Sequence, residues 1–320
     1  MNFLDVRHLS VSFTQEQGSV QAVRDVSFSI DEGETLAVVG ESGAGKSQVF
    51  HALLGLQAKN ARVAGSAKLA GQELIGLPAT QLNQYRGNAL RIIFQDPMTA
   101  LNPYLKIGVQ LTEILQVHQG ASYQQARTQA LQALQEVKLP NPEWNFQQYP
   151  HELSGGMRQR VMIAMAILGH PRLIIADEPT TALDVTVQSD IISLLKKIHQ
   201  QHGTSMVLIT HDIPLVAGLC ERIMMMYAGK IVETGTLQEI HQQARHPYTR
   251  ALLQATPANQ RNSGKLVSIA GQPPDPRQLP TGCAFAPRCE KARRQCQTAQ
   301  PELTAVSDTQ QVACFFAEEN

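Results

Sequence analysis

The chain has 320 residues, of which 43% are hydrophobic and 17% charged, a balance that favours a folded protein with a large core and more than one domain. Its 27 basic and 27 acidic side chains cancel, which argues against general nucleic-acid binding, because such binding requires a basic surface. No apolar run approaches the ~18 residues that cross a bilayer, and Met1–Arg7 carries charges where a signal peptide is apolar, so we expect a cytoplasmic chain.

Residues 1–35 alternate apolar and polar side chains, a pattern typical of antiparallel strands with one exposed face. The apolar positions are Leu4, Val6, Leu9, Val11, Phe13, Val26, Phe28 and Ile30.

A glycine-rich loop follows the apolar run Thr35–Val39 and precedes a helical stretch, Gln48–Leu54. The loop fits the phosphate-binding pattern G-x-x-x-x-G-K-[ST] and reads Gly40, Glu41, Ser42, Gly43, Ala44, Gly45, Lys46, Ser47. Its glycines let backbone N–H groups point at phosphate oxygens, and the helix N-terminus adds its positive dipole end. We expect Lys46 to reach the β- and γ-phosphates and Ser47 to hold Mg²⁺. A plain glycine-rich turn is the alternative, which the flanking elements disfavour.

Residues 62–94 predict further short strands, the last at Leu90–Phe94, and residues 105 to 169 then show a helical pattern. The apolar positions are Ile107, Val109, Leu111, Ile114 and Leu115 in one helix and Ala126, Ala130, Leu131, Leu134 and Val137 in another. Strand-like runs return at Leu173–Ala176, Met206–Ile209 and Arg222–Met226. A helix is predicted at Val185–His199, between the first two of these runs. Strands alternating with helices predict an α/β fold with a mainly parallel sheet covered on both faces.

Two further stretches carry candidate site residues. The run Leu173–Glu178 ends in Asp177, which we expect to help position Mg²⁺, and Glu178, which we expect to polarise the attacking water. An acidic cap of the strand end is the alternative. Leu153-Ser154-Gly155-Gly156 precedes an apolar helix at Val161–Leu168 and predicts Ser154 as its N-cap. This stretch is either a capped core helix or a second anion-binding helix end.

Together these motifs resemble the nucleotide-binding subunits of ABC transporters over about residues 1–250. The matching features, in chain order, are the phosphate loop, Gln95 after Phe94, Leu153–Gly156, Asp177–Glu178, Ala182–Asp184, and His211 after Leu208–Thr210. The resemblance implies a P-loop NTPase core with an antiparallel β subdomain and a helical subdomain at about residues 96–168. A soluble ABC ATPase of DNA repair or translation is the alternative, but the long coiled-coil insertion or second cassette usual in such proteins is not evident.

The resemblance also implies roles for single residues. Two such domains pair head to tail around two ATP molecules, so that Ser154, Gly155 and Gly156 act on the nucleotide of the partner. His211 contacts the γ-phosphate, and Gln95 lies near Mg²⁺ and the attacking water. Phe13 lies where the family places a ring against adenine, although a core phenylalanine would suit the same strand.

Four stretches narrow the resemblance to oligopeptide and dipeptide importers, and to the first of their two ATPase subunits: Phe94–Pro103, Tyr149–Met157, Ala176–Val185 and His246–Leu253. This resemblance implies a subunit at the cytoplasmic face of the inner membrane whose hydrolysis of ATP powers the import of peptides. The implied partners are a second ATPase subunit in a heterodimer, two membrane subunits and an extracytoplasmic peptide-binding protein.

Residues 251–320 are rich in proline, hold four of the five cysteines, and are predicted to form an irregular C-terminal extension. The four are Cys283, Cys289, Cys296 and Cys314, in the spacing C-x5-C-x6-C-x17-C. Zinc sites show tighter pairs, and a reducing cytoplasm disfavours disulfides, so the spacing leaves a metal centre or four ordinary thiols. Peptide importers with similar cysteines carry a [4Fe–4S] cluster, and this resemblance favours the cluster. A regulatory iron–sulfur module with ATPase activity is a further alternative.

Other residues of this region have plainer interpretations. The charged side chains between the cysteines, Arg288, Lys291, Arg293 and Arg294, are read as a solvated face, with compensation of a cluster's charge as the alternative. Cys220 stands apart and is predicted to be a buried small hydrophobic residue.

Overall fold

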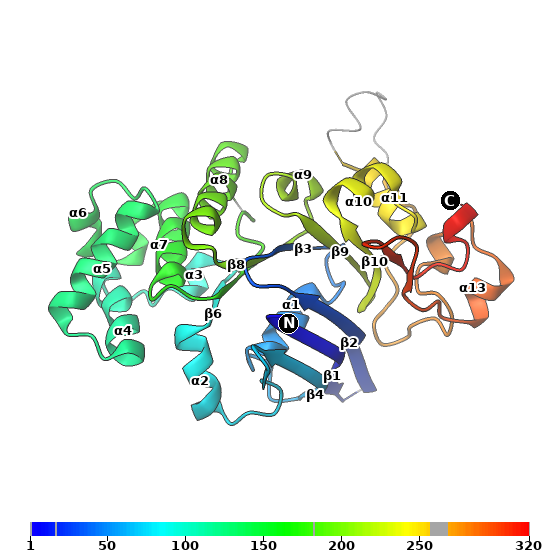
Figure 1. Ribbon diagram of the computed structural model, residues 1–320, viewed down its shortest axis with the longest axis horizontal. Helices are drawn as coiled ribbons and strands as arrows, with labels where there is room; N and C mark the ends of the chain where they lie inside the picture. The colour runs from blue at the N-terminus through cyan, green and yellow to red at the C-terminus, as the bar shows by residue number, and fades with distance from the viewer. Residues whose placement is uncertain (1, 17, 182, 257–267, 320) are drawn as a thin grey trace. The chain divides into compact units, whose positions relative to one another are not determined.

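The structure is a computed structural model that describes residues 2–319 except residues 17, 182 and 257–267 (Figure 1). The chain divides into two compact units. The first comprises Met1–Asp31, Thr35–Gly76 and Thr210–Asn320, and the second comprises Glu32–Glu34 and Leu77–Ile209.

An antiparallel sheet forms the N-terminal part of the first unit (Figure 1). Its strand order is β2-β1-β4-β5, with bounds β1 (Leu4–Gln15), β2 (Gly18–Ile30), β4 (Ala61–Leu69) and β5 (Gln72–Glu73). Along β1, Leu4, Leu9 and Val11 are fully buried whereas Arg7 is exposed. The sequence prediction of antiparallel strands with one exposed face is therefore confirmed.

A second sheet segment in the first unit has the order β11-β12-β10-β9-β3. Strand β3 (Thr35–Val39) runs parallel to β9 (Arg222–Tyr227), and β10 (Lys230–Thr236) is antiparallel to β9. Strands β12 (Gln311–Val312) and β11 (Thr304–Ala305) continue the sheet beyond β10. The C-terminal region therefore supplies edge strands to this sheet. Within the described residues, the helices of this unit are α1 (Lys46–Leu53), α9 (Ile213–Val216), α10 (Leu237–Gln243), α11 (Pro247–Gln254), η2 (Ala286–Arg288), α13 (Arg294–Thr298) and η3 (Ala317–Glu319).

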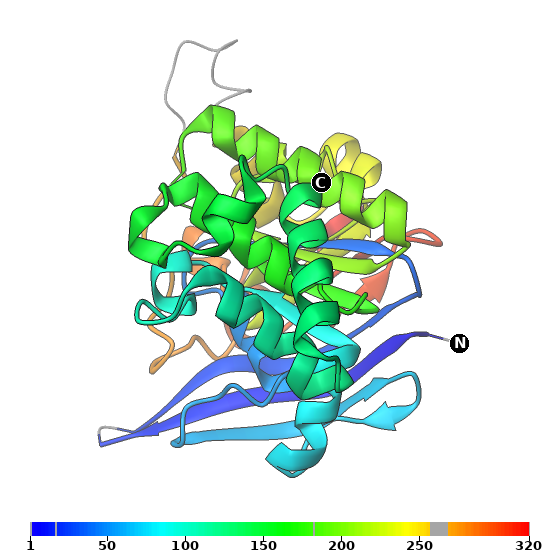
Figure 2. The same ribbon diagram turned by 90° about the vertical axis from the view of Figure 1, so that its left-hand side faces the viewer.

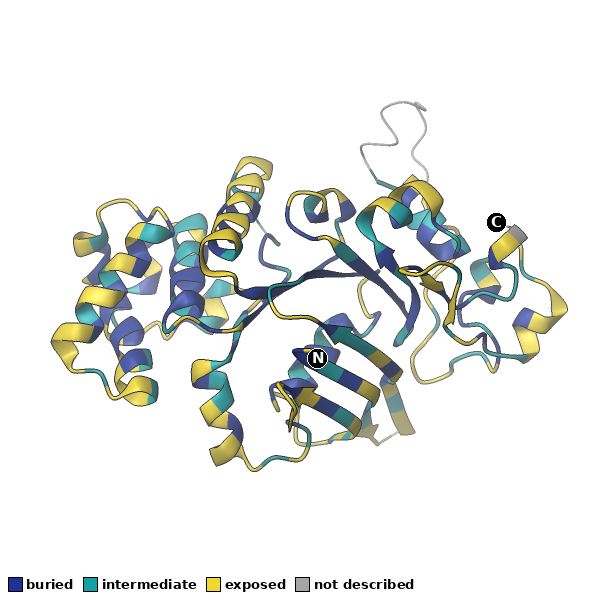
Figure 3. Ribbon diagram, in the orientation of Figure 1, coloured by how far each residue is buried: buried dark blue, intermediate teal, exposed yellow. Residues whose placement is uncertain are grey.

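The second unit contains a parallel sheet segment in the order β8-β7-β6. Its strands are β6 (Leu90–Ile93), β7 (Leu173–Asp177) and β8 (Ser205–Thr210). Every residue of β7 and β8 is buried, which Figure 3 shows in dark blue. Unbroken burial fits the near-continuous apolar sequence of strands that are covered on both faces.

Helices make up most of the second unit, and Figure 2 shows the green helices α4, α5, α7 and α8 lying side by side. The bounds are α2 (Ala79–Asn88), α3 (Pro97–Ala100), α4 (Ile107–Gln119), α5 (Tyr123–Glu136), α6 (Pro142–Phe146), η1 (Pro150–Glu152), α7 (Gly155–Ile167) and α8 (Val185–His202). A capping box of Ser122 and Gln125 starts α5. Helix α8 starts at the N-cap Asp184 and ends at Gly203, whose φ of 63° suits glycine.

The structure confirms the α/β class and the mainly parallel sheet, but it also adds a helix that the sequence pattern missed. Helix α2 lies within residues 62–94, where only strands were predicted. Only Leu82 and Gly87 of this helix are buried, so it lacks the apolar stripe from which a surface helix is recognised. The proposed boundary near residue 250 stays a prediction. Among the described residues, no helix combines the length and apolar character that crossing a membrane requires.

Candidate functional site

The predicted phosphate loop connects β3 to α1 in the first unit. Gly40 and Gly45 are positions where a side chain has no room. A Cβ atom would lie 2.3 Å from the Met226 carbonyl oxygen at Gly40 and 2.2 Å from the Ala22 carbonyl oxygen at Gly45. Gly45 also has a φ of 93° and serves as the N-cap of α1. These two glycines allow the tight turn into a helix whose first N–H groups have no partner within the helix.

Lys46, the first residue of α1, is buried and turned back over this loop. Its Nζ donates to the carbonyl oxygens of Gly40 at 2.8 Å and Glu41 at 3.1 Å. Ser47 follows it and is half-buried. A held ammonium group beside a helix N-terminus is suited to binding phosphate.

Two acidic residues lie at the end of β7 in the second unit. Asp177 ends the strand and is 5% exposed, and Glu178 follows it with a φ of 46°, which is uncommon for a residue other than glycine. The Glu178 Oε2 atom accepts hydrogen bonds from Gln95 Nε2 at 3.1 Å and from Thr181 Oγ1 at 3.0 Å. The structure thus brings Gln95 and Glu178 together. It also adds Thr181, which sequence reasoning missed because a single threonine in a turn follows no periodic pattern.

The second predicted helix end is α7, also in the second unit. Ser154 accepts a hydrogen bond from the Met157 backbone N–H at 3.4 Å, so the predicted N-cap is confirmed. Ser154 and Gly155 are exposed. At Gly156 a Cβ atom would lie 3.3 Å from Val187, so glycine allows α7 to approach α8 closely. This helix start is exposed, as contact with an anion on another molecule requires.

The remaining motif residues lie on or beside strands. Phe13 of β1 is half-buried between Val20 of β2 and Ala61 of β4, which leaves part of its ring accessible. His211 is exposed and directly follows β8. Asp184 accepts from the Val187 backbone N–H at 3.0 Å, whereas Ala182 of the same motif lies outside the described residues.

The predicted site residues are therefore divided between the two units. The first unit holds the phosphate loop, Phe13 and His211, and the second holds Gln95, Asp177, Glu178 and Ser154–Gly156. Three of these residues were predicted to hold Mg²⁺, and they offer a hydroxyl, a carboxylate and an amide oxygen: Ser47, Asp177 and Gln95. Because Mg²⁺ prefers hard oxygen ligands, this donor set fits the ion.

The four C-terminal cysteines line one pocket in the first unit, with His246 and Phe285 among its other walls. Among the residues that the structure describes, no three Cys, His, Asp or Glu side chains are arranged to hold a single metal ion. A cluster of several iron atoms is larger than one ion, so its cysteine ligands surround a space and do not converge on one point. Cys283, Cys289, Cys296 and Cys314 all line the same pocket.

Backbone N–H groups point at three of these sulfur atoms. Cys283 accepts from Phe285 and Ala286, Cys289 from Lys291, and Cys314 from Phe316. Burial nevertheless raises the pKa of all three thiols, because removal from water disfavours the thiolate. Four cysteines that line one pocket, three of them with N–H donors to sulfur, fit an iron–sulfur ligand set. The fifth cysteine, Cys220, is 5% exposed, so its predicted role as a buried small residue is confirmed.

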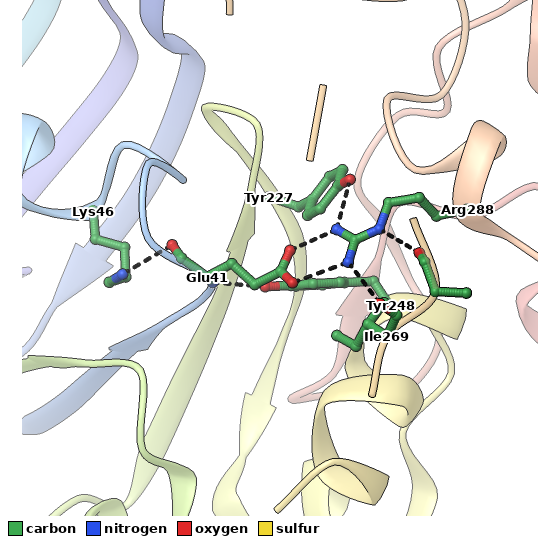
Figure 4. A network of polar contacts seen from close by, with 7 residues as sticks. Glu41, Lys46, Tyr227, Tyr248, Ile269 and Arg288 are labelled. Atoms are coloured by element: carbon green, nitrogen blue, oxygen red, sulfur yellow. Dashed lines mark hydrogen bonds and ion pairs between the residues drawn. The ribbon is translucent and has the colours of Figure 1, made fainter. Parts of the chain in front are cut away.

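The prediction of a solvated charged face is wrong for Arg288. Lys291, Arg293 and Arg294 are exposed, but the Arg288 side chain is only 4% exposed. It forms an ion pair with Glu41 of the phosphate loop (Figure 4). The pattern of alternating charges is local, and it carries no signal for a partner 247 positions away.

Comparisons with known proteins agree with this geometry. The family model described as ABC transporter matches residues 23–181, and the model described as oligopeptide/dipeptide transporter, C-terminal region, matches residues 232–296. The chain is 49% identical to the oligopeptide transport ATP-binding protein OppD of Haemophilus influenzae over 99% of this chain and 98% of that protein. It is 47% identical to OppD of Salmonella typhimurium over 98% of this chain and 93% of that protein. A solved dimeric ATP-binding cassette, MJ0796, in a post-hydrolysis state bound to ADP and Pi, is 28% identical with a TM-score of 0.66, over 73% of this chain and 98% of that one.

Proposed function

We propose the working role of this chain from one premise: the chain belongs to the ABC transporter family, as one of its oligopeptide transport ATP-binding proteins. It is an ATPase subunit, and its hydrolysis of ATP powers the import of peptides. The observation that carries the ATPase assignment is the phosphate loop, with Lys46 held over glycines that admit no side chain. The match of residues 232–296 carries the peptide-transport class.

The phosphate loop binds the triphosphate of ATP in this proposal. Its backbone N–H groups and Lys46 offset the charge of the β- and γ-phosphates. Ser47, Asp177 and Gln95 hold Mg²⁺, which neutralises further phosphate charge when bound. The ring of Phe13 contacts the adenine base.

Glu178 acts on the water that attacks the γ-phosphate. Its carboxylate accepts from Thr181 and Gln95, and these two contacts fix the direction in which it can accept a proton from water. Phosphoryl transfer depends on positioning and charge neutralisation more than on covalent chemistry, so a held carboxylate is sufficient. His211 donates to the γ-phosphate and responds to its loss.

A second ATPase subunit completes each site. The start of α7 at Ser154, Gly155 and Gly156, of which the first two are exposed, faces the γ-phosphate that the partner binds, and the partner's equivalent faces the phosphate loop of this chain. ATP closes this pair and hydrolysis reopens it. Gln95 and the residues that follow it transmit the motion to the membrane subunits.

The complete importer places this chain at the cytoplasmic face of the inner membrane, bound to its partners there. It consists of a heterodimer with a second ATPase subunit, two permease subunits and an extracytoplasmic peptide-binding protein. Cys283, Cys289, Cys296 and Cys314 bind a [4Fe–4S] cluster, a proposal supported by their common pocket and by the backbone N–H donors to three of them. The cluster fastens a segment that is too small to build a core of its own.

Reconstitution tests this function. The assembled transporter in lipid vesicles should hydrolyse ATP and take up a labelled oligopeptide, and both activities should stop when ATP is withheld. An assembly that takes up peptide while consuming no ATP would refute the assignment.

A further inference from the structure

Arg288 in the C-terminal extension reaches the phosphate loop with both ends of its guanidinium group. Its Nη1 lies 2.7 Å from Glu41 Oε2, and its Nη2 lies 3.0 Å from Glu41 Oε1. The two residues are 247 positions apart in sequence. This parallel pair of charge-assisted hydrogen bonds is stronger and more directional than a single ion-pair contact.

The guanidinium group is fixed on its other sides as well (Figure 4). It also donates to the Tyr227 hydroxyl at 3.2 Å, the Ala270 carbonyl at 2.9 Å and the Ile269 carbonyl at 3.5 Å. All five of its N–H groups therefore have acceptors. The rings of Tyr227 and Phe285 each lie 5.8 Å from its central carbon. A side chain held this fully and only 4% exposed differs from a surface ion pair, which contributes little.

Glu41 is held through its backbone in addition to its carboxylate. Its N–H donates to the hydroxyl of the buried Tyr248 at 2.8 Å. Its carbonyl oxygen accepts from the Ala44 N–H at 3.2 Å and from Lys46 Nζ at 3.1 Å. Glu41 therefore contacts both the Arg288 guanidinium, through its carboxylate, and the Lys46 ammonium group that is predicted to bind phosphate, through its carbonyl oxygen.

The same extension touches the loop at a second place. Pro273, Pro274, Pro276 and Leu279 line a small pocket together with the loop residues from Glu41 to Ala44. Arg288 itself directly precedes Cys289 and follows Cys283 by five positions. The segment that carries Cys283 and Cys289 thus also contacts the phosphate loop, through Arg288.

We propose that Arg288 is a positioning residue of the nucleotide site: it holds Glu41, and through it Lys46, in the phosphate-binding arrangement, and it couples the loop to the segment bearing Cys283 and Cys289. The inference rests on the proposed ATPase function. Without Arg288, the Glu41 carboxylate loses the cation with which it forms an ion pair among the described residues, and it must turn towards water. Its uncompensated negative charge then also opposes the approach of a triphosphate.

Substitutions test this role in the full-length chain within the assembled transporter. Arg288→Gln should weaken the affinity for a fluorescent ATP analogue by about tenfold and raise the KM for ATP equally, with kcat within about twofold of the parent, because the chemistry at Glu178 is untouched. Arg288→Lys keeps the charge but loses the paired contact, so its affinity for the analogue should lie between those of the parent and of Arg288→Gln. In a chain that already carries Glu41→Gln, adding Arg288→Gln should weaken the affinity for the analogue by less than about a further twofold.

The matched control is Arg277→Gln. Arg277 also forms a pair with both carboxylate oxygens of Asp275 within the extension, but that pair is exposed and joins residues two positions apart. This variant should bind ATP as the parent does. An Arg288→Gln variant with parental affinity, or one whose loss adds in full to that of Glu41→Gln, would overturn the positioning role while leaving the ATPase assignment in place. An unaltered chain that binds no ATP would instead overturn that assignment.

Hydrogen exchange tests the coupling without relying on any variant that fails to fold. Because linkage is reciprocal, binding of a non-hydrolysable ATP analogue should slow amide exchange in residues 283–289 of the unaltered chain. Arg288→Lys should reduce this protection. Equal exchange with and without the analogue would exclude the coupling.

Discussion

Replacing Glu178 with glutamine should separate ATP binding from ATP hydrolysis. Glutamine has nearly the same shape, and its amide oxygen can still accept from Thr181 Oγ1 or Gln95 Nε2, which lie 3.0 Å and 3.1 Å from the present carboxylate oxygen. Local structure is therefore kept, and the change removes only the negative charge and the ability to accept a proton.

The size of the effect follows from this role. A positioned acid–base group contributes about 10²–10⁴-fold to a rate, which corresponds to about 2.7–5.4 kcal/mol of transition-state stabilisation. The glutamine oxygen can still accept from Thr181 or from Gln95. We therefore expect the loss of turnover to come from the missing charge and to lie within this range. Affinity for ATP should stay within about twofold, because the substitution leaves unchanged the Gly40 and Glu41 carbonyl oxygens to which Lys46 Nζ donates.

The assay compares steady-state ATP turnover of the assembled transporter at saturating Mg²⁺–ATP with equilibrium binding of a fluorescent ATP analogue. Thr181→Val is the matched control, since it keeps the charge and removes one hydrogen bond worth about 1.5 kcal/mol, or about tenfold in rate. Turnover by Glu178→Gln above about one-tenth of the parent would refute the role given to this carboxylate.

Three further outcomes follow from the structure. Lys46→Ala should weaken binding of the ATP analogue by at least about tenfold in fluorescence titration, because it removes the ammonium group held over the loop, and parental affinity would contradict the phosphate-binding assignment. Anaerobic purification should give a brown protein containing iron and sulfide, and Cys289→Ser should lose most of both; a colourless, iron-free parent would end the cluster proposal. Burial, and then the neighbouring Glu221, raises the pKa of Cys220 to about 12, so its thiol stays protonated at lower pH. Alkylation of Cys220 in the folded protein should therefore stay slow up to about pH 10, above the usual thiol pKa of about 8.5, and fast labelling at pH 9 would show that the site is not closed.

Local features of the fold and site could be predicted from the sequence. The phosphate loop, the acidic end of β7 and the N-cap Ser154 each depend on residues adjacent in the chain, and the structure places them as expected. Strands β3 and β7 were recognisable because unbroken apolar runs are typical of strands buried on both faces.

Long-range features could not be predicted in this way. The pair Arg288–Glu41 joins distant segments, and a charged residue among other charged residues reads as solvated until its burial is known. The edge strands β11 and β12 contain two residues each, too few for an alternation pattern. Thr181 is recognised as a site residue only from its hydrogen bond to the Glu178 carboxylate, which the sequence does not show.

The central claim is that ATP hydrolysis by this subunit drives peptide uptake. The most direct measurement is uptake of a labelled oligopeptide into vesicles that contain the assembled transporter and ATP, with either the parent chain or Glu178→Gln. Uptake that falls in parallel with ATP turnover in the variant is the expected result. Peptide accumulation that continues at the parental rate after hydrolysis has stopped would contradict the account.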